Sequence, residues 1–348
     1  MKITKAFTLL LAASLLVLLV SCGIIAGENS TPSAEASQTV SVQESSEEPQ
    51  PDESEAEPSA DVPAGGSINI VVLGDSIARG YGLADYEHER YSALLGEMLK
   101  ERYDEVIIAN YGIDGQTGRE LADSLASNPP AELAEADAVV ISIGGNNVLT
   151  RLSELFSDSE MFNEETAAAL KDYFTYMLAS DSVGQAKFAS AAENLNGILK
   201  KVNSAFDSGE FDALIADAAN KLREELPAIV SAVRGAGAKR VLVQTIYNPY
   251  YDMVINLRGV ETKLDLAERG EQSVAELNKV INELASANGY ETVEIHDAFS
   301  ASLDKLTNSG IDLTSAAAGM PLNFGVDPHP NALGHQLIAE LVKDKILG

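Results

Sequence analysis

The chain has 348 residues, of which 45% are hydrophobic, so it is long enough to bury a sizeable core. It carries 24 basic and 53 acidic residues, a formal net charge of -29, which argues against binding nucleic acid or anionic lipid headgroups through surface charge, because both need basic patches. The single cysteine, Cys22, excludes an internal disulfide and a cysteine-based zinc cluster.

The N-terminus has the pattern of a targeting segment. Lys2 and Lys5 precede an apolar run over residues 6–20, which has the length of a signal-peptide core and is shorter than most membrane-spanning helices. The run ends in LVSCG, residues 19–23, which resembles the lipobox of bacterial lipoproteins. By that resemblance residues 1–22 form a lipoprotein signal peptide, and Cys22 is lipidated. An uncleaved membrane helix and a secretory signal cut elsewhere are the alternatives, and both also export the rest of the chain.

Residues 23–66 are predicted to be a disordered linker. From residue 27 to residue 66 the chain is rich in Ser, Glu, Pro and Ala, with ten acidic residues and no Lys, Arg or aromatic residue. Such a segment buries too little apolar surface to offset its ordering entropy, and its like charges and prolines keep it extended. We expect a tether that holds a domain over residues 67–348 away from the membrane.

Strands alternate with helices in residues 67–348. Short apolar runs predict five strands, at residues 68–73, 106–109, 138–143, 240–244 and 292–295. Helical spacing predicts helices at residues 90–102, 119–127 and 331–346. This alternation implies an α/β fold with a parallel sheet covered on both faces. Ligands bind beyond the carboxyl ends of such strands, so functional residues are expected directly after each strand.

A long helical stretch interrupts this alternation between the third and fourth strands. Residues 149–237 are predicted to form a helical insertion, with helices at residues 164–178, 185–201 and 211–234. The stretch is too long for a simple crossover, and we interpret it as a cap that shapes a pocket. Extra packing without a role in binding is the alternative, and the sequence does not decide between the two.

A serine follows the first predicted strand. Residues 74–82 read GDSIARGYG, and a serine at a strand-to-helix turn exposes its hydroxyl and leaves its backbone N–H free. Ser76 can therefore act as a nucleophile and as one donor of an oxyanion hole. An ordinary helix cap formed by Asp75 or Ser76 is the alternative explanation of this cluster.

Two further clusters supply candidate oxyanion donors. Residues 110–117, NYGIDGQT, follow the second strand and contain Gly115, where the lack of a side chain lets the backbone N–H approach a reacting carbonyl. Residues 144–147, GGNN, follow the third strand and offer the side-chain amide of Asn146. A turn is the alternative explanation of residues 110–117, and it is the favoured explanation of residues 144–147 when that cluster is taken singly.

A histidine beside a carboxylate precedes the last helix. Residues 327–331 read DPHPN, and an imidazole next to an acid is the base and orienting group of a nucleophilic triad. A solvated loop histidine and a helix cap at Asn331 are the alternatives. Of the other three histidines, His335 is predicted on a helix surface, His296 is expected to be structural at the end of a strand, and His88 is a weaker candidate base in a polar loop.

Taken together, the four clusters resemble the GDSL-type lipase/esterase family, also called SGNH hydrolases. The family is named for Ser, Gly, Asn and His, which match Ser76, Gly115, Asn146 and His329 in this sequence. The resemblance spans residues 68–348 apart from the helical insertion. It implies a flavodoxin-like three-layer α/β/α fold with a parallel five-stranded sheet. It also implies ester hydrolysis through an acyl-enzyme, with Ser76, Gly115 and Asn146 forming the oxyanion hole and with no metal or cofactor.

The sequence departs from the family pattern at the acid of the triad. The family usually places this acid three residues before the histidine, where this chain has Val326. The nearest acid is Asp327, two residues before His329, and the flanking prolines fix the backbone there. Asp327 is therefore our candidate for the group that orients the imidazole, with a backbone carbonyl as the alternative. The third cluster also ends in Asn147, where the family commonly has Asp.

These inferences combine into the prediction of an extracytoplasmic, lipid-anchored serine esterase. Its expected substrates are acyl or acetyl esters of lipids or glycans, either small molecules or polymers. Contact with the membrane is expected through lipidated Cys22, and no nucleic-acid partner is expected. A non-catalytic surface lipoprotein that captures a ligand is the alternative, although a binding protein has no need for the complete set of four family residues. The sequence predicts neither the acyl chain length nor the oligomeric state.

Overall fold

The computed structural model describes the chain over residues 65–158, 172, 176, 181–206, 209–249, 253–257, 260–264, 267–300, 306–308, 310–312, 323–325 and 329–348. The predicted signal peptide with Cys22, the linker up to residue 64, and the candidate acid Asp327 lie outside the described residues. Within the described ranges, no helix combines the length and the apolar character needed to cross a membrane.

A five-stranded parallel sheet forms the centre of the fold. Its strands lie in the order β2-β1-β3-β4-β7, and every neighbouring pair is parallel. Their bounds are Ser67–Gly74 (β1), Glu105–Gly112 (β2), Ala138–Ser142 (β3), Arg240–Gln244 (β4) and Glu291–Val293 (β7). Numbered along the chain, the strands follow the flavodoxin-like order 2-1-3-4-5. The structure therefore confirms the predicted fold class.

The strands β1 and β3 form because most of their residues are buried from both sides, whereas β2 lies at the edge of the sheet and is only partly buried. β3 is buried along its whole length, and strands covered on both faces read as continuous apolar runs. The last strand is shorter than predicted. The expected strand over residues 292–295 is wrong at its C-terminal end, because Ile295 already begins the helix α11 (Ile295–Ser300).

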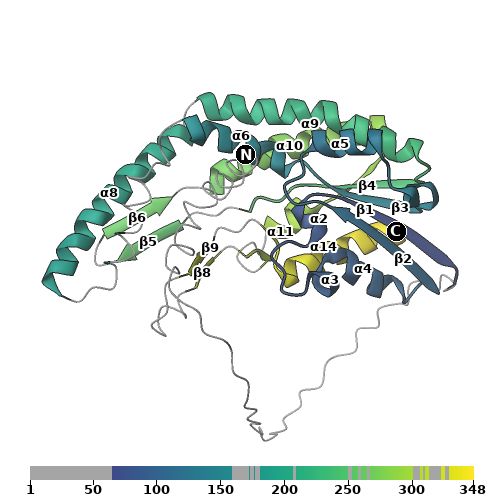
Figure 1. The fold of residues 1–348 in the computed structure, drawn as a ribbon, viewed down its shortest axis with the longest axis horizontal. Coiled ribbons are helices and arrows are strands. Elements are labelled where there is room, and N and C mark those ends of the chain that lie inside the picture. Colours follow the sequence, from purple (N-terminus) through teal and green to yellow (C-terminus); the bar gives the residue numbers. More distant parts are fainter. Residues whose placement is uncertain are drawn as a thin grey trace, which may run out of the picture.

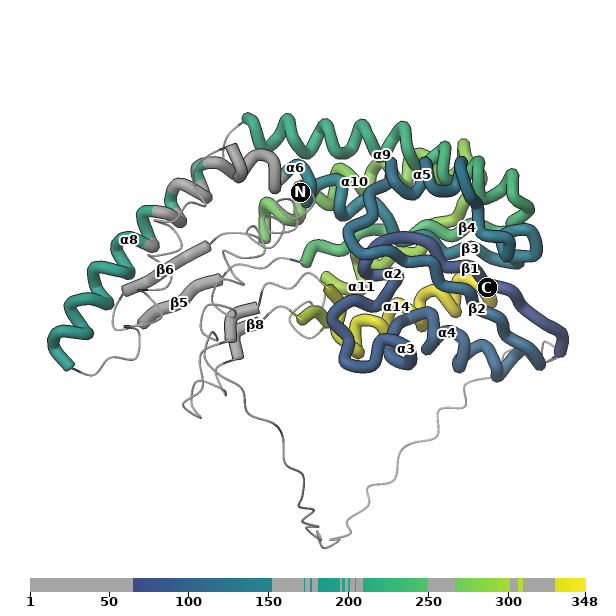
Figure 2. The backbone as a smooth tube through the Cα atoms, in the orientation of Figure 1, coloured from purple at the N-terminus to yellow at the C-terminus, as the bar shows by residue number. Residues whose placement is uncertain are grey.

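Helices cover both faces of the sheet (Figure 1). One layer contains α5 (Gly118–Ser127), α6 (Gly145–Asp158), α9 (Gly209–Gly235) and α10 (Ala267–Asn288), and the other contains α3 (Tyr86–Glu89), α4 (Tyr91–Leu99), α11 and α14 (Ala332–Leu347). The path of the chain in Figure 2 shows the strands side by side between these layers. Alternate residues of β3 enter two separate cores. Val139 and Ile141 pack into one, and Ala138 and Val140 into the other.

The predicted helical insertion is only partly separate from the sheet. In Figure 1, α8 (Ser182–Phe206) extends away from the sheet. By contrast, α9 buries Leu222, Leu226 and Ile229 in a core that it shares with the strands, so it is one of the covering helices. Most of the helix predicted at residues 164–178 lies outside the described residues.

Some elements have no counterpart in the sequence prediction. β5 (Met253–Leu257) and β6 (Val260–Leu264) form an antiparallel hairpin, and β6 lies against α8. A second antiparallel pair joins β8 (Gly310–Asp312) to β9 (Asn323–Gly325). These strands are too short to stand out by periodicity, and they lie apart from the central sheet.

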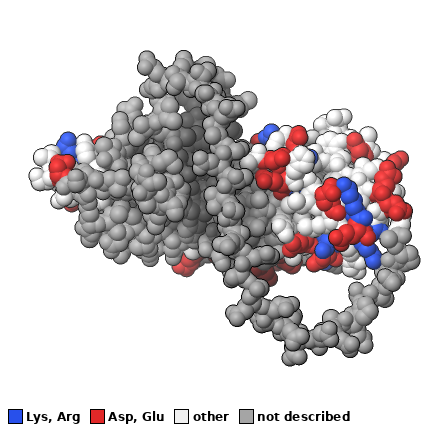
Figure 3. Space-filling view, turned by 90° about the horizontal axis from the view of Figure 1, so that it is seen from below, with Lys and Arg blue, Asp and Glu red and all other residues white. Residues whose placement is uncertain are grey.

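Charged side chains of both signs are interspersed on the face below the sheet. Figure 3 shows Asp and Glu side chains over the described part of this face, with Lys and Arg side chains among them. Exposed pairs on the described surface include Lys100 with Glu97 and Arg240 with Glu291. Such exposed ion pairs contribute about 0–1 kcal/mol each, so we assign the charge to the solvation of the surface rather than to stability.

Candidate active site

Ser76 is the first residue of the short helix α2 (Ser76–Arg79), directly beyond the carboxyl end of β1. Asp75 is the N-cap of this helix, and its carboxylate accepts a hydrogen bond of 3.0 Å from the backbone N–H of Ile77. Gly80 ends the helix in the left-handed conformation. Because Asp75 supplies the cap, the hydroxyl of Ser76 is left for another partner.

That partner is His329, from the other end of the sequence. The Nε2 atom of His329 lies 2.9 Å from the Oγ atom of Ser76, within hydrogen-bond distance. Asn331 holds the segment that presents the imidazole. Its side chain caps α14 by accepting from the N–H of Gly334 (3.1 Å), and it donates to the carbonyl of Thr307 (3.1 Å). The structure therefore brings together the predicted nucleophile and the predicted base.

One face of the imidazole lies against Tyr81, which sequence reasoning did not single out. The centroids of the two rings are 4.5 Å apart, and Tyr81 is nonetheless 47% exposed. Tyr81 therefore packs against the imidazole and limits the movement of the ring. The predicted orienting acid Asp327 lies outside the described residues, so its role stays a prediction.

The candidate oxyanion donors start from the same edge of the sheet as Ser76. Gly74, at the end of β1, pairs with Gly112 at the end of β2 and with Ser142 at the end of β3. The three strands therefore end level, and the loops that follow them begin side by side. Gly115 lies three residues beyond Gly112 in the second of these loops, and Asn146 lies four residues beyond Ser142, as the second residue of α6.

A hydrogen bond joins the start of α6 to the second loop. The Nδ2 atom of Asn146 donates to the carbonyl of Gln116 at 3.1 Å, so Asn146 contacts the loop that contains Gly115. Gly115 has a φ of 74°, in the left-handed region that glycine adopts without strain. Among the described residues, no atom lies within 4 Å of a Cβ atom built at Gly115.

A family model described as GDSL-like Lipase/Acylhydrolase family matches residues 72–337. The match includes all four residues that carry the resemblance and covers more than half of the chain. The chain belongs to the GDSL-like lipase/acylhydrolase family. This membership makes the protein an ester hydrolase, as the sequence predicts.

Three solved structures resemble this GDSL-like hydrolase at low sequence identity. A lipase from a goat rumen metagenome is 15% identical over 80% of this chain and 96% of its own, with a TM-score of 0.47. A phospholipase A1 from Streptomyces albidoflavus is 16% identical over 80% and 98%, with a TM-score of 0.45. A catalytic mutant of an acetylxylan esterase from Geobacillus stearothermophilus is 14% identical over 81% and 95%, with a TM-score of 0.44. No curated protein matched the sequence.

The structure corrects the prediction for His335. This residue was expected on the surface of the last helix of the hydrolase, but it is fully buried, so that prediction is wrong. Its Nδ1 atom accepts a hydrogen bond of 3.2 Å from the backbone N–H of Tyr91. Burial lowers the pKa of His335 to about 3, and a positive charge on His329 acts in the same direction. His335 is therefore neutral near pH 7 and packs the core rather than competing as a base.

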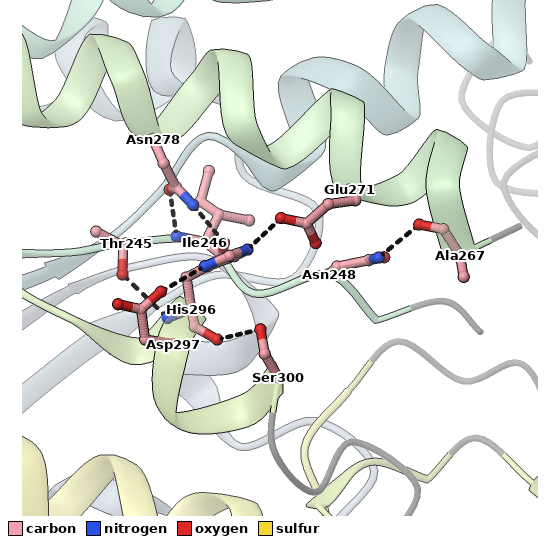
Figure 4. Close-up of polar contacts among 9 residues, drawn as sticks. All are labelled: Thr245, Ile246, Asn248, Ala267, Glu271, Asn278, His296, Asp297 and Ser300. Atoms are coloured by element: carbon pink, nitrogen blue, oxygen red, sulfur yellow. Dashed lines mark hydrogen bonds and ion pairs between the residues drawn. The ribbon is translucent and has the colours of Figure 1, made fainter.

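His296 and His88 also have partners other than Ser76. The ring of His296 lies between Glu271 (Nε2 to Oε1, 2.8 Å) and Asp297 (Nδ1 to Oδ1, 3.0 Å), and it links α10 to α11 (Figure 4). Burial lowers the pKa of His296, but the two carboxylates outweigh it and raise the pKa above its ordinary value. This agrees with the structural role predicted for His296, although the residue begins a helix instead of ending a strand. His88 is exposed and bonds to Asp85.

Asp75 is a buried carboxyl group next to the nucleophile. It is 3% exposed, and burial raises its pKa from 3.8 to about 6, although the Ile77 N–H and a positive charge on His329 oppose the shift. With Ser142 and Gln244, among others, it lines a cavity of about 20 Å³. That volume is enough for a water molecule and too small for an acyl chain, so this cavity is not the substrate pocket.

Replacing Asp75 by Asn is expected to change how stability depends on pH. Between about pH 4 and pH 6 the folded state binds a proton at Asp75 that the unfolded chain has already released, so the free energy of unfolding falls as the pH rises. A shift from 3.8 to about 6 corresponds to a loss of at most about 3 kcal/mol. Asn keeps an oxygen that can cap α2 but does not titrate.

Urea unfolding of the wild type and Asp75→Asn from pH 4 to pH 8 measures this effect. The variant should gain stability relative to the wild type as the pH rises to about 6, and the difference should then stay constant. A difference that is the same at every pH would contradict the expectation.

Within the described part of the chain, no group of His, Cys, Asp and Glu side chains is arranged to hold a metal ion.

Proposed function

We propose that this GDSL-like hydrolase is a serine esterase in which Ser76 is the nucleophile and His329 the general base. The observation that carries the proposal is the 2.9 Å separation of Oγ and Nε2. As Oγ bonds to the ester carbonyl carbon, its proton passes to Nε2, and the π electrons of the carbonyl move onto its oxygen. The backbone N–H groups of Ser76 and Gly115 and the side-chain amide of Asn146 stabilise that oxyanion.

The same groups complete the reaction. When the tetrahedral intermediate collapses, Nε2 of His329 returns the proton to the leaving alcohol, and the acyl group stays on Ser76. A water molecule then gives a proton to His329 and attacks the acyl carbon, and Ser76 leaves with that proton. Ester and water are converted to acid and alcohol with no external oxidant or reductant. In this proposal Asp327 orients the imidazole and stabilises its positive charge.

The proposal includes a location and a class of substrate. Lipidated Cys22 would anchor the protein outside the cytoplasm, and residues 23–66 would tether the hydrolase domain to the membrane. Its substrates would be acyl or acetyl esters of lipids or glycans that are met there. The support for the location is the pattern of charge, apolar residues and the cysteine in the first 23 residues.

Labelling of fractionated cells with a fluorescent fluorophosphonate tests both parts. Such a probe forms a covalent bond with an activated serine. The full chain should label in the membrane fraction, Ser76→Ala should not label although it is present and folded, and Cys22→Ser should label outside the membrane fraction. A folded wild type that does not label would refute the serine mechanism. A Cys22→Ser variant that stays with the membrane would refute the anchor.

A further inference from the structure

A buried amide and a buried carboxylate join α9 to the oxyanion loop, which we define as residues 113–117. The Nδ2 atom of Asn147 donates to Oε2 of Glu225 at 2.8 Å. The Oδ1 atom of the same amide accepts from the backbone N–H of Gly118 at 3.1 Å. The exposed fraction is 6% for Asn147 and 8% for Glu225, so water does not compete effectively for these bonds.

These contacts hold the end of the oxyanion loop. Gly118 is the first residue of α5, directly after the loop, and the loop contains the candidate donor Gly115. The neighbouring side chain of Asn146 binds the carbonyl of Gln116 within the loop. Two consecutive asparagines at the start of α6 therefore bind two backbone groups that lie within three residues of Gly115.

The carboxylate of Glu225 packs directly on this backbone. A Cβ atom at Gly118 would collide with Oε2 of Glu225, so a side chain there would displace the carboxylate. A negative charge is favourable at the N-terminus of a helix such as α5, where backbone N–H groups lack partners within the helix. Glu225 therefore lies against the first turn of α5, where Asn147 binds the N–H of Gly118.

Glu225 occupies a position where an apolar side chain would pack α9 at less cost. Its neighbours Leu222, Leu226 and Ile229 on this helix are buried in the core. Burial raises the pKa of Glu225, although the hydrogen bond from Asn147 and the charge of Arg119 oppose the shift. A buried polar group of this kind contributes orientation, because its hydrogen bonds are directional and costly to leave unmade.

We propose that Glu225 and Asn147 are positioning residues of the oxyanion hole. Glu225 accepts from Nδ2 and thereby keeps Oδ1 of Asn147 on the Gly118 N–H, which fixes the loop that presents the N–H of Gly115. The inference rests on the proposed serine mechanism. It also gives the helical stretch before β4 a part in catalysis, because Glu225 belongs to α9.

Exchanging the hydrogen-bond donor and acceptor between Asn147 and Glu225 tests this role. In Asn147→Asp, a carboxyl group faces Glu225, and at a pH where both groups are ionised no donor lies between the two, so the loop should shift. A misplacement of about 1 Å costs about 100-fold in rate, and we expect a loss of that size in kcat with a small change in KM. Glu225→Gln keeps an acceptor oxygen and should lose less than tenfold. The double variant N147D/E225Q restores one donor and one acceptor, and its kcat should return to within about tenfold of the wild type.

A transition-state readout separates positioning from a merely structural effect. An acyl trifluoromethyl ketone forms a tetrahedral adduct with a serine nucleophile, and the oxygen of this adduct occupies the oxyanion hole. Its inhibition constant should rise in Asn147→Asp in parallel with the loss of kcat, and it should recover in the double variant. The matched control is Asn278→Asp, because Asn278 is a buried amide whose bonds go to both backbone groups of Ile246 (2.7 and 2.8 Å) and not to the oxyanion loop. This control should lower the melting temperature while leaving the inhibition constant within about threefold.

The outcomes distinguish this inference from the serine mechanism on which it rests. If Ser76→Ala keeps the activity of the wild type, the serine mechanism fails. If Ser76→Ala is inactive and Asn147→Asp keeps kcat within threefold of the wild type, the positioning role alone is refuted. The positioning role would also be refuted if the loss of kcat in the double variant equalled the product of the losses in the two single variants. Should Asn147→Asp not fold, Asn147→Ser removes both hydrogen bonds without adding charge, and the same readouts then apply.

Discussion

Replacing His329 by alanine is expected to lower kcat/KM for ester hydrolysis by about 10⁴- to 10⁶-fold. The variant has no group at 2.9 Å from Oγ of Ser76 that accepts the proton, so the hydroxyl must attack without losing it. Ser76→Ala should lose a similar factor. Because the two residues act as a unit, the double variant should be no slower than either single variant. Steady-state hydrolysis of 4-nitrophenyl acetate, with the melting temperature of each variant, measures these effects.

His88→Ala provides the control for this comparison. His88 is the weaker candidate base in the sequence, and in the structure it is exposed and bonded to Asp85. Its removal should leave kcat/KM within about twofold of the wild type, since surface changes away from a site have small effects. A His329→Ala variant that keeps a tenth of the activity, or a large loss in His88→Ala, would show that His329 is not the base.

The parts of this site that follow buried strands are predictable from the sequence for a physical reason. A parallel strand covered on both faces is a continuous apolar run, so β1 and β3 are visible and the residues after them are known to share one edge of the sheet. Ser76 and Asn146 are found by counting from the ends of these strands, and Gly115 by counting from the end of β2, an edge strand that is only partly buried. His329 lies before a helix, and its place beside Ser76 depends on how α14 packs against the other face of the sheet.

The burial of His335 does have a signal in the sequence. Ile338, Ala339 and Val342 follow it at helical spacings of three, four and seven residues, and all three are buried with His335 on one face of α14. A histidine on that face is a core residue even though its immediate neighbours are polar or small. Helical spacing is therefore a better guide to burial than the character of adjacent residues.

The hydrogen-bond partner of Glu225 cannot be predicted from the sequence. Its position between Leu222 and Leu226 marks it as a charge on the buried side of α9, which is a visible anomaly. Its partner Asn147 is 78 residues away, and the contact depends on the rotation of α9 against α5 and α6. Nothing local fixes that rotation, because it results from packing across two other helices. The structure is needed to identify the partner and, through it, the link to the oxyanion loop.

Asn146→Ala is expected to lower kcat by about 10²- to 10³-fold while KM changes little, because an oxyanion donor acts mainly after charge has formed on the carbonyl oxygen. One N–H of the Asn146 amide is used by the carbonyl of Gln116, and the amide carries a second N–H for the oxyanion. Loss of the first bond leaves a buried carbonyl without this donor and should also lower stability by about 1–3 kcal/mol.

Comparison with Asn110→Ala separates the loss of kcat in Asn146→Ala from its loss of stability. Asn110 is a further amide near the end of β2, where it donates to the carbonyl of Ala78 in α2 (2.7 Å) and accepts from the N–H of Gly112 (2.9 Å). Its removal should lower stability by a similar amount but should spare more of kcat, since its bonds hold the end of β2 and it is not a candidate oxyanion donor. Equal losses of kcat in the two variants, at equal losses of stability, would mean that Asn146 supports the loop and does not itself donate to the oxyanion.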